Sequence, residues 1–192
     1  MKKTANLLFE ISSLRKIIRS HRAVLLIDDM SDNIAAHSFL VTWVALLIAR
    51  KEKANVEKVL TMALVHDVPE TRTGDIAWIN KHYVKDFESD AITDMFPPEL
   101  EIPDLVELLK EYHERKTLEA KVVKDADRIA QMMVLKEYVF AYNNQQAKEW
   151  TEDLTEEWFQ SFYTKTGQAL IRAIDQIKVN DWTKGLSTNK RR

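Results

Sequence analysis

Apolar residues recur along most of the chain every three or four positions, which is the spacing of one face of an α-helix. The first such segment covers residues 5–20. The second, residues 34–51, is apolar on nearly every side and follows a polar loop, 28–33, that offers N-cap residues. A helix of this kind is typical of the centre of a bundle.

The same periodicity predicts further helices, and no stretch alternates at period two for long enough to indicate a strand. These helices are expected over residues 55–67, from Asp75 to Pro97, and over residues 104–115, 117–142 and 154–177. We therefore expect an all-α fold, a compact multi-helix bundle. One domain is expected over residues 1–178, followed by a disordered basic tail over residues 179–192.

Composition agrees with helices, because the 192 residues include only three Gly and four Pro. Hydrophobic residues make up 45% and charged residues 30%, as in soluble globular proteins. The longest apolar run, 39–49, is too short to span a bilayer. Glu10 and Arg15 interrupt the N-terminal region before a signal-peptide core forms. These features predict a cytoplasmic protein with no membrane partner.

The charge balance restricts the partners, since 28 basic and 30 acidic residues give a formal charge of −2. Such a chain has no basic field to collect long nucleic acid. The absence of cysteine excludes disulfides and leaves His, Asp and Glu as metal ligands. Imidazole and oxygen ligands suit Mn, Co, Ni, Fe, Zn or Mg.

The candidate chemistry begins at His66 and Asp67, where an apolar helix ends in an imidazole beside a carboxylate. Adjacent residues on a helix project about 100° apart, but at a loosening helix end both groups can converge on one ion. A single His-Asp pair is common and carries little weight alone. His37 lies inside the apolar helix over residues 34–51, where a buried imidazole needs a partner. That partner can be a metal or a backbone carbonyl.

Asp127 is a third candidate, in a mostly apolar stretch of the helix over residues 117–142. Taken alone, it is better explained as a surface carboxylate paired with Arg128 or Lys124. One metal ion would account for all of these polar groups on apolar helices together.

The order of these residues resembles the HD-domain superfamily of metal-dependent phosphohydrolases, in the branch that contains the bacterial 5′-deoxynucleotidase. The string from His66 to Asp75, His-Asp-Val-Pro-Glu-Thr-Arg-Thr-Gly-Asp, carries most of the resemblance. The segments Ala36-His37-Ser38 and Lys124-Asp125-Ala126-Asp127-Arg128 add to it. The resemblance covers residues 5–175, nearly the whole chain.

The resemblance implies an all-helical fold and one divalent metal ion. It implies that the metal ligands are His37, His66, Asp67 and Asp127. Asp125 competes for the last position, but the family pattern places the ligand second in Asp-Ala-Asp, which favours Asp127.

The resemblance also implies that Glu70 and Asp75 line the site and handle water and protons. Other readings of both residues stay open. Glu70 can be a solvated loop carboxylate paired with Arg72, and Asp75 after Gly74 can be the N-cap of a following helix.

Arg19 resembles the arginine that meets the substrate phosphate in the deoxynucleotidase, although a cation at a helix C-terminus explains it equally well. Arg72 and Lys124 are weaker phosphate candidates. Two residues depart from the family pattern: Ala36 stands where Glu usually precedes the first histidine, and Ser20 stands where a Trp follows the arginine. Discrimination of deoxyribose is therefore left open.

The expected activity is metal-dependent hydrolysis of (deoxy)nucleoside 5′-monophosphates to nucleoside and phosphate. The alternatives are another small phosphate ester, a nucleoside triphosphate, or a non-catalytic helical module with a structural metal. The sequence places His21, His82 and His113 outside the site. The expected partners are a small phosphorylated substrate and a second copy of the chain, with a dimer interface near the aromatic residues of the C-terminal helix.

Overall fold

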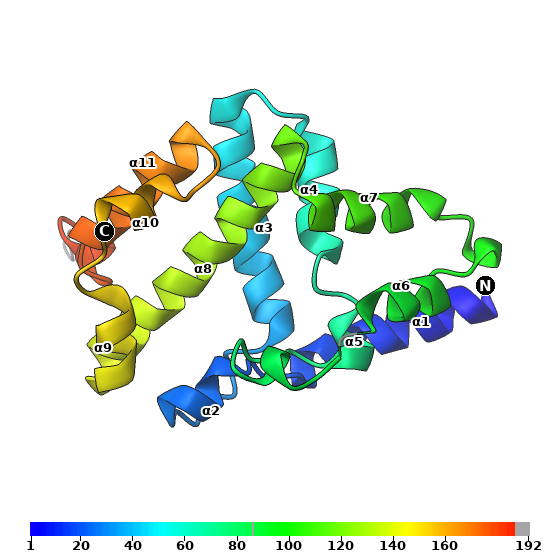
Figure 1. Ribbon diagram of the computed structural model, residues 1–192, viewed down its shortest axis with the longest axis horizontal. Coiled ribbons are helices and arrows are strands. Elements are labelled where there is room, and N and C mark those ends of the chain that lie inside the picture. The colour runs from blue at the N-terminus through cyan, green and yellow to red at the C-terminus, as the bar shows by residue number, and fades with distance from the viewer. Residues whose placement is uncertain (86, 187–192) are drawn as a thin grey trace, which may run out of the picture.

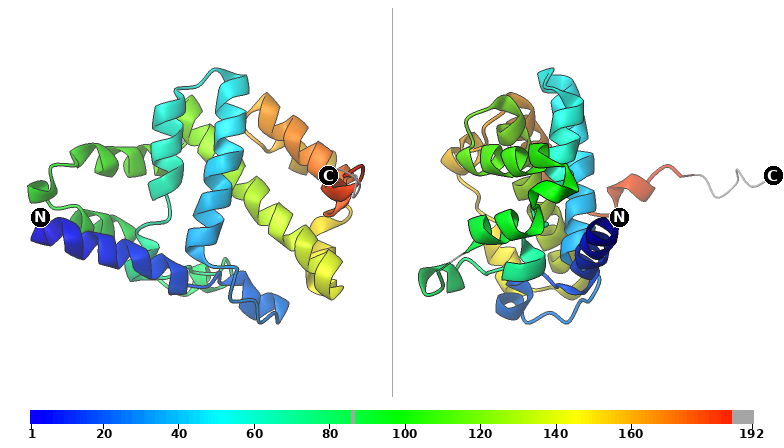
Figure 2. Two further views of the ribbon diagram at one scale, coloured as in Figure 1. Left: turned by 180° about the vertical axis from the view of Figure 1, so that it is seen from behind. Right: turned by 90° about the vertical axis from the view of Figure 1, so that its right-hand side faces the viewer.

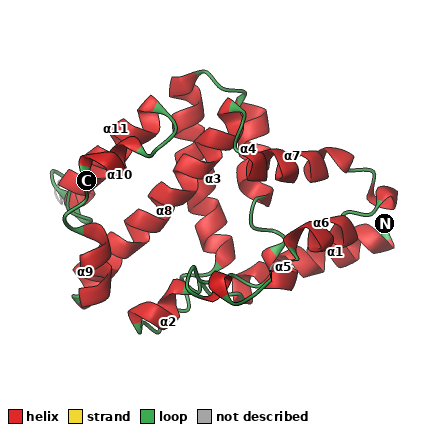
Figure 3. Ribbon diagram, viewed as in Figure 1, coloured by secondary structure: helices red, strands yellow, loops and turns green. Residues whose placement is uncertain are grey.

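The computed structural model describes residues 1–85 and 87–186, and this part of the chain is almost entirely helical (Figures 1 and 3). Its N-terminal half contains α1 (Lys2–Ser12), η1 (Ser13–Lys16), α2 (His21–Leu25), α3 (Ile34–Glu52), α4 (Val56–Val65), α5 (Glu70–Thr73), η2 (Asn80–His82) and α6 (Glu88–Met95). The remainder contains η3 (Pro98–Leu100), α7 (Pro103–Glu114), α8 (Leu118–Tyr142), α9 (Gln145–Thr151), α10 (Glu156–Gln160), α11 (Lys165–Gln176) and η4 (Asp181–Thr183). The described residues form no strand, so the predicted all-α class is confirmed.

The helix α3 lies at the centre and packs against α4, α8 and α11. The side chain of Asn33 caps its N-terminus by accepting a hydrogen bond from the amide of Ala36 at 3.1 Å. The length and apolar composition of α3 would also suit a membrane crossing. In the fold, however, α3 crosses α8 (Figure 1). Apolar side chains of the two helices form much of the core.

The helices α3, α4 and α8 hold the residues that the sequence singles out. The predicted bounds of these three helices agree with the structure to within two residues. An isolated antiparallel bridge joins Ile18 to Asn33 and ties the chain after η1 to the start of α3. This bridge brings Arg19 to the same end of α3 as His37.

The single helix predicted from Asp75 to Pro97 is wrong. The structure has a loop, the short η2 and then α6, which begins only at Glu88. Trp78, Tyr83 and Phe87 are all exposed, so this segment has no buried face that would stabilise a long helix.

The helix predicted over residues 154–177 is interrupted between α10 and α11. The cause is the buried carboxylate of Asp125 on α8, which accepts hydrogen bonds from the amides of Tyr163 and Thr164 at 2.9 and 2.8 Å. The hydroxyl of Thr164 also donates to it and caps α11. The short helices α2 and α9 were not predicted. In the expected tail, residues 181–183 form η4, and residues 187–192 lie outside the described residues.

The substitution Gly167→Ala is expected to destabilise the fold by about 2 kcal/mol, because overpacking outweighs the gain in helix propensity. An added Cβ would overlap the buried Oδ2 of Asp125 and lie 2.8 Å from the hydroxyl of Thr164. Urea unfolding measures the effect. Lys165→Ala, at an exposed position of the same helix, is the control. Equal stability of both variants would contradict the tight contact.

Candidate metal centre

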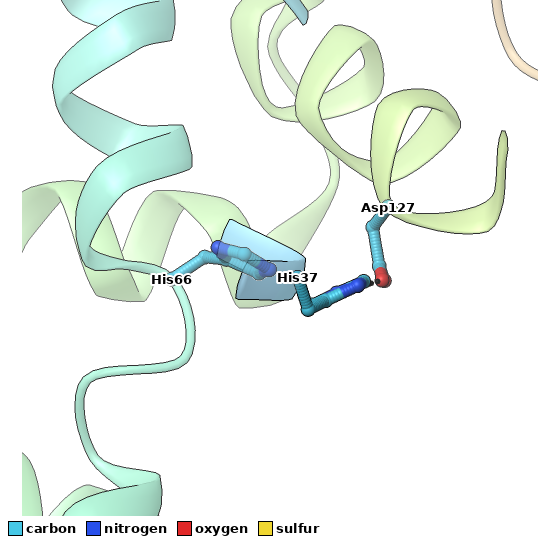
Figure 4. Close-up of side chains that lie close together, drawn as sticks. All are labelled: His37, His66 and Asp127. Carbon is cyan, nitrogen blue, oxygen red and sulfur yellow. Dashed lines mark hydrogen bonds and ion pairs between the residues drawn. The ribbon is translucent and has the colours of Figure 1, made fainter. Parts of the chain in front are cut away.

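Three helices bring His37, His66 and Asp127 together (Figure 4). His37 comes from the first turn of α3, His66 follows the last residue of α4, and Asp127 lies in α8. One ligand atom from each of the three lies within 4.8 Å of the other two. Nε2 of His37 is 3.1 Å from Oδ1 of Asp127.

The imidazole of His66 has one nitrogen engaged and one without a partner. Its Nδ1 lies 2.8 Å from the carbonyl oxygen of Ala63, which only accepts, so Nδ1 carries the hydrogen. Nε2 is buried and forms no hydrogen bond, although Oδ2 of Asp67 lies 3.2 Å away. A histidine oriented through Nδ1 by a backbone carbonyl, with Nε2 free, is the usual arrangement of a metal ligand.

Asp67 lies against both imidazoles. Its Oδ2 is 3.2 Å from Nε2 of His66, 3.6 Å from Nε2 of His37 and 3.4 Å from Nη1 of Arg19. Burial alone would raise the pKa of its carboxyl, but the charge and hydrogen bonding of His66 and the charge of His37 lower it to about 2. Asp67 therefore offers an ionised oxygen beside the other three residues.

Asp127 is partly buried and has three partners of its own. Lys124 Nζ lies 2.8 Å from its Oδ2, the hydroxyl of Tyr112 donates to the same oxygen at 3.3 Å, and His37 lies at the other oxygen. Burial opposes ionisation, but the hydrogen bond from His37 and the charge of Lys124 hold its pKa well below the usual range. Asp125 instead faces α11, so the structure selects Asp127 as the carboxylate at the histidines.

Arg19 and Asp75 complete this side of the site. Nη1 of Arg19 lies 3.4 Å from Asp67, and Nε lies 3.4 Å from Oδ2 of Asp75 without a hydrogen bond. Burial lowers the pKa of Arg19, but the charges of Asp75 and Asp67 outweigh it and raise the pKa overall. Asp75 accepts a hydrogen bond from the amide of Ser20 at 2.8 Å. It does not cap a helix, so that alternative reading is wrong.

Glu70 begins the short helix α5 and points into the same space. Its Oε2 is buried without a hydrogen bond. Burial and the charges of Asp67 and Asp75 raise its pKa to about 10. The alternative pairing of Glu70 with Arg72 is wrong, because Arg72 binds Glu10 with its Nη2 at 3.1 Å from Oε2.

All of these groups except His37 line a cleft of about 450 Å³. Four carboxyl groups face the cations of Arg19 and Lys124, and Nε2 of His66 lies 3.2 Å from Oδ2 of Asp67. An excess of oxygen ligands beside two imidazoles fits a divalent cation. The structure thus supplies a His/Asp group suited to a metal.

Tyr112 and His21 are among the cleft residues that the sequence did not predict. Tyr112 reads as an ordinary core aromatic of α7, and His21 precedes any clear helical pattern, so neither gives a signal in the sequence. His113 lines the rim and lies 3.1 Å from Glu88, whereas His82 is exposed. Trp78 also lines the cleft and is exposed.

A family model described as HD domain matches residues 11–178. Three of the curated relatives are 5′-deoxynucleotidases. HDDC2 of Mus musculus is 29% identical over 113 residues, which is 56% of this chain and 56% of the relative. The enzyme hdd1 of Schizosaccharomyces pombe is 30% identical over 59% of this chain and 62% of its own. YfbR of Escherichia coli is 29% identical over 60% of this chain and 65% of its own. The chain thus spans little more than half the length of HDDC2.

Solved structures share the fold. A protein from Pyrococcus horikoshii has a TM-score of 0.72 at 22% identity, over 91% of this chain and 99% of that one. A protein from Magnetospirillum magnetotacticum, described as a predicted metal-dependent phosphohydrolase, has a TM-score of 0.65 at 23% identity, over 90% and 89% of the two chains.

Proposed function

This chain belongs to the HD-domain family, and from that premise we propose that it is a divalent-metal-dependent phosphohydrolase. The proposed reaction is hydrolysis of the phosphomonoester of a (deoxy)nucleoside 5′-monophosphate to nucleoside and phosphate. The nucleotide class is supported by the relatives described as 5′-deoxynucleotidases. The resemblance of the motif around His66 to the family is therefore confirmed.

The observation that carries the proposal is the buried, unpartnered Nε2 of His66 beside His37 and Asp127. Leaving a buried polar atom unpaired costs about 1–3 kcal/mol, so such an atom calls for a ligand. We assign His37, His66, Asp67 and Asp127 to one divalent cation. The absence of sulfur ligands suits Mn, Co, Ni, Fe, Zn or Mg.

A divalent cation held there would act as a Lewis acid on a phosphoryl oxygen and lower the pKa of water. A cation in the cleft would offset the charges of Asp67 and Asp75 that raise the pKa of Glu70 and would favour its ionised form. Glu70 is then the proposed acceptor of the proton from the attacking water, because its carboxyl enters the cleft with one oxygen unpaired. Asp75 holds the amide of Ser20 and lies beside Arg19. It thereby positions the arginine that we assign to the phosphate, and it orients water or the leaving alcohol.

Arg19→Ala is expected to raise KM for the phosphomonoester by about 10- to 100-fold. A charge-assisted hydrogen bond contributes about 1.5–3 kcal/mol, and each 1.4 kcal/mol is a factor of ten. Steady-state phosphate release measures this change, with Arg72→Ala as the control because Arg72 binds Glu10 outside the cleft. Equal effects of the two substitutions would contradict the assignment of Arg19 to the substrate phosphate.

The activity itself is tested by phosphate release from the ribo- and deoxyribonucleoside 5′-monophosphates. The metal-stripped protein is compared with protein given Mn, Co, Ni, Fe, Zn or Mg in turn. Release that requires a metal and a nucleotide supports the proposal. Release only from other phosphate esters or from nucleoside triphosphates would change the substrate, and metal binding without any release would indicate a structural site.

We also propose a cytoplasmic homodimer. Exposed apolar side chains at four-residue intervals on α3 support the dimer, namely Phe39, Trp43 and Leu47. The left view of Figure 2, from behind, shows α3 in front of α8. Burying such a stripe against a second copy would remove apolar surface from water. Size-exclusion chromatography with light scattering tests this, and a monomeric mass would contradict it.

A further inference from the structure

His21 belongs to a second polar group that opens into the same cleft. It begins α2 and is only 7% exposed. Its Nε2 lies 2.7 Å from Oδ2 of Asp32, and the hydroxyl of Tyr138 donates to the same oxygen at 2.8 Å. All three side chains are buried, so their contacts belong to the packed fold and are not a chance contact at the surface.

The carboxylate of Asp32 determines which nitrogen of His21 carries a hydrogen. Burial would raise the pKa of Asp32, but the hydrogen bond and charge of His21 and the hydrogen bond of Tyr138 lower it. An ionised carboxylate only accepts, so Nε2 of His21 must donate. The neutral imidazole then presents Nδ1 as an acceptor. Nδ1 has no hydrogen-bond partner among the described residues. Unlike Nε2 of His66, it is not fully buried, so it keeps some contact with solvent.

The position of His21 places its side chain next to the phosphate end of the cleft. Arg19, two residues earlier, lies against Asp67 and Asp75, and Ser20 between them has a helical backbone, so His21 follows Arg19 within one turn. On α8, Tyr138 follows Asp127 by eleven positions, or about 16 Å along the helix.

The surroundings of His21 suit a nucleoside. Gln131 lies one turn after Asp127 and lines the same cleft, together with the apolar side chains of Val24 and Trp78. The cleft therefore combines hydrogen-bonding groups with apolar surface, as sites for small organic ligands do.

We infer that His21 is a specificity-determining residue whose Nδ1 accepts a hydrogen bond from a sugar hydroxyl of the nucleotide. This inference rests on the proposed function, because it assigns the sugar subsite of the same cleft. When the sugar lacks that hydroxyl, Nδ1 of His21 has no hydrogen-bond partner in a partly desolvated site. The site therefore binds the nucleotide that lacks the hydroxyl less tightly. Asp32 and Tyr138 act through His21 by holding its ring and its tautomer.

His21→Ala is expected to lower kcat/KM for a nucleoside monophosphate about tenfold, mainly through KM, since one hydrogen bond is lost. Hydrolysis of p-nitrophenyl phosphate, which has no sugar, should not change. His21→Gln should recover part of the loss, because a glutamine amide can donate to Asp32 while its oxygen accepts from the hydroxyl. An equal loss on both substrates, or no loss on the nucleotide, would overturn the inference.

A binding measurement separates this inference from the proposed function. Calorimetry of the metal-free protein compares a nucleoside with its 2′,3′-dideoxy analogue. The wild type is expected to bind the nucleoside about tenfold more tightly, and His21→Ala should bind the two alike. If no ester is hydrolysed but this difference is found, the proposed function fails and the sugar contact stands. If phosphate is released without such a difference, only the sugar contact fails.

Discussion

Asp67→Ala and Asp127→Ala are each expected to reduce metal-dependent phosphate release by about 10³-fold, equivalent to about 4 kcal/mol of transition-state stabilisation. Each substitution removes an ionised oxygen beside the two imidazoles. Loss of Asp127 also leaves Lys124 and His37 without their carboxylate, so the site gains positive charge where a cation should bind.

Metal content measured by elemental analysis, alongside phosphate release, tests this result. Asp94→Asn is the matched control, because Asp94 is exposed and its contact with Arg72 is 4.0 Å long. The control should keep both metal and activity. Full activity in both alanine variants would refute the assignment of the metal ligands. A loss of activity with the metal retained would show that these carboxylates have a role other than metal binding.

The second large effect is expected from Glu70→Gln, with kcat lowered about 10²- to 10⁴-fold, the usual contribution of general acid–base catalysis. Glutamine has nearly the same shape but cannot accept a proton from water. Its amide should fit the pocket of the metal-free protein, where burial and the charges of Asp67 and Asp75 favour the uncharged carboxyl of Glu70. The fold and the metal content should therefore be preserved.

Glu57→Gln on the exposed face of α4 is the control for this measurement. The diagnostic readout is kcat with saturating substrate, together with metal content. A wild-type kcat in Glu70→Gln would exclude the residue as the proton acceptor. Loss of the metal in that variant would instead indicate that Glu70 holds the ion.

The contrast between Asp125 and Asp127 illustrates what a linear pattern cannot resolve. Both residues lie in an apolar stretch of one helix, so periodicity alone leaves them as competitors for the same role, and only the resemblance to the family favours Asp127. Two positions along a helix turn the side chain by about 200°, so one carboxylate faces the histidines and the other faces α11. Which one faces which is decided by the packing of α8 against α3, α4 and α11.

His21 is a second residue whose surroundings a linear pattern cannot reveal. A lone histidine before a five-residue helix has no periodic pattern around it. Its partner Asp32 is eleven positions away, and Tyr138, which completes the group, is 106 positions from Asp32. Only the packing of α8 beside the loop before α3 brings them together. Tertiary packing also explains why the helix predicted after Asp75 is wrong, because that segment has no surface of the fold to pack against.

By itself, the sequence determined the helical class, the central helix and the motif from His66 to Asp75. These are written in local periodicity and in short strings, which depend on neighbours within a few turns of helix. The tertiary structure alone decided that Asp75 holds Ser20, that Arg19 lies beside Asp67, and that His21 meets Asp32 and Tyr138. Those outcomes depend on contacts between residues tens of positions apart, and the direction of each side chain is set by how whole helices pack.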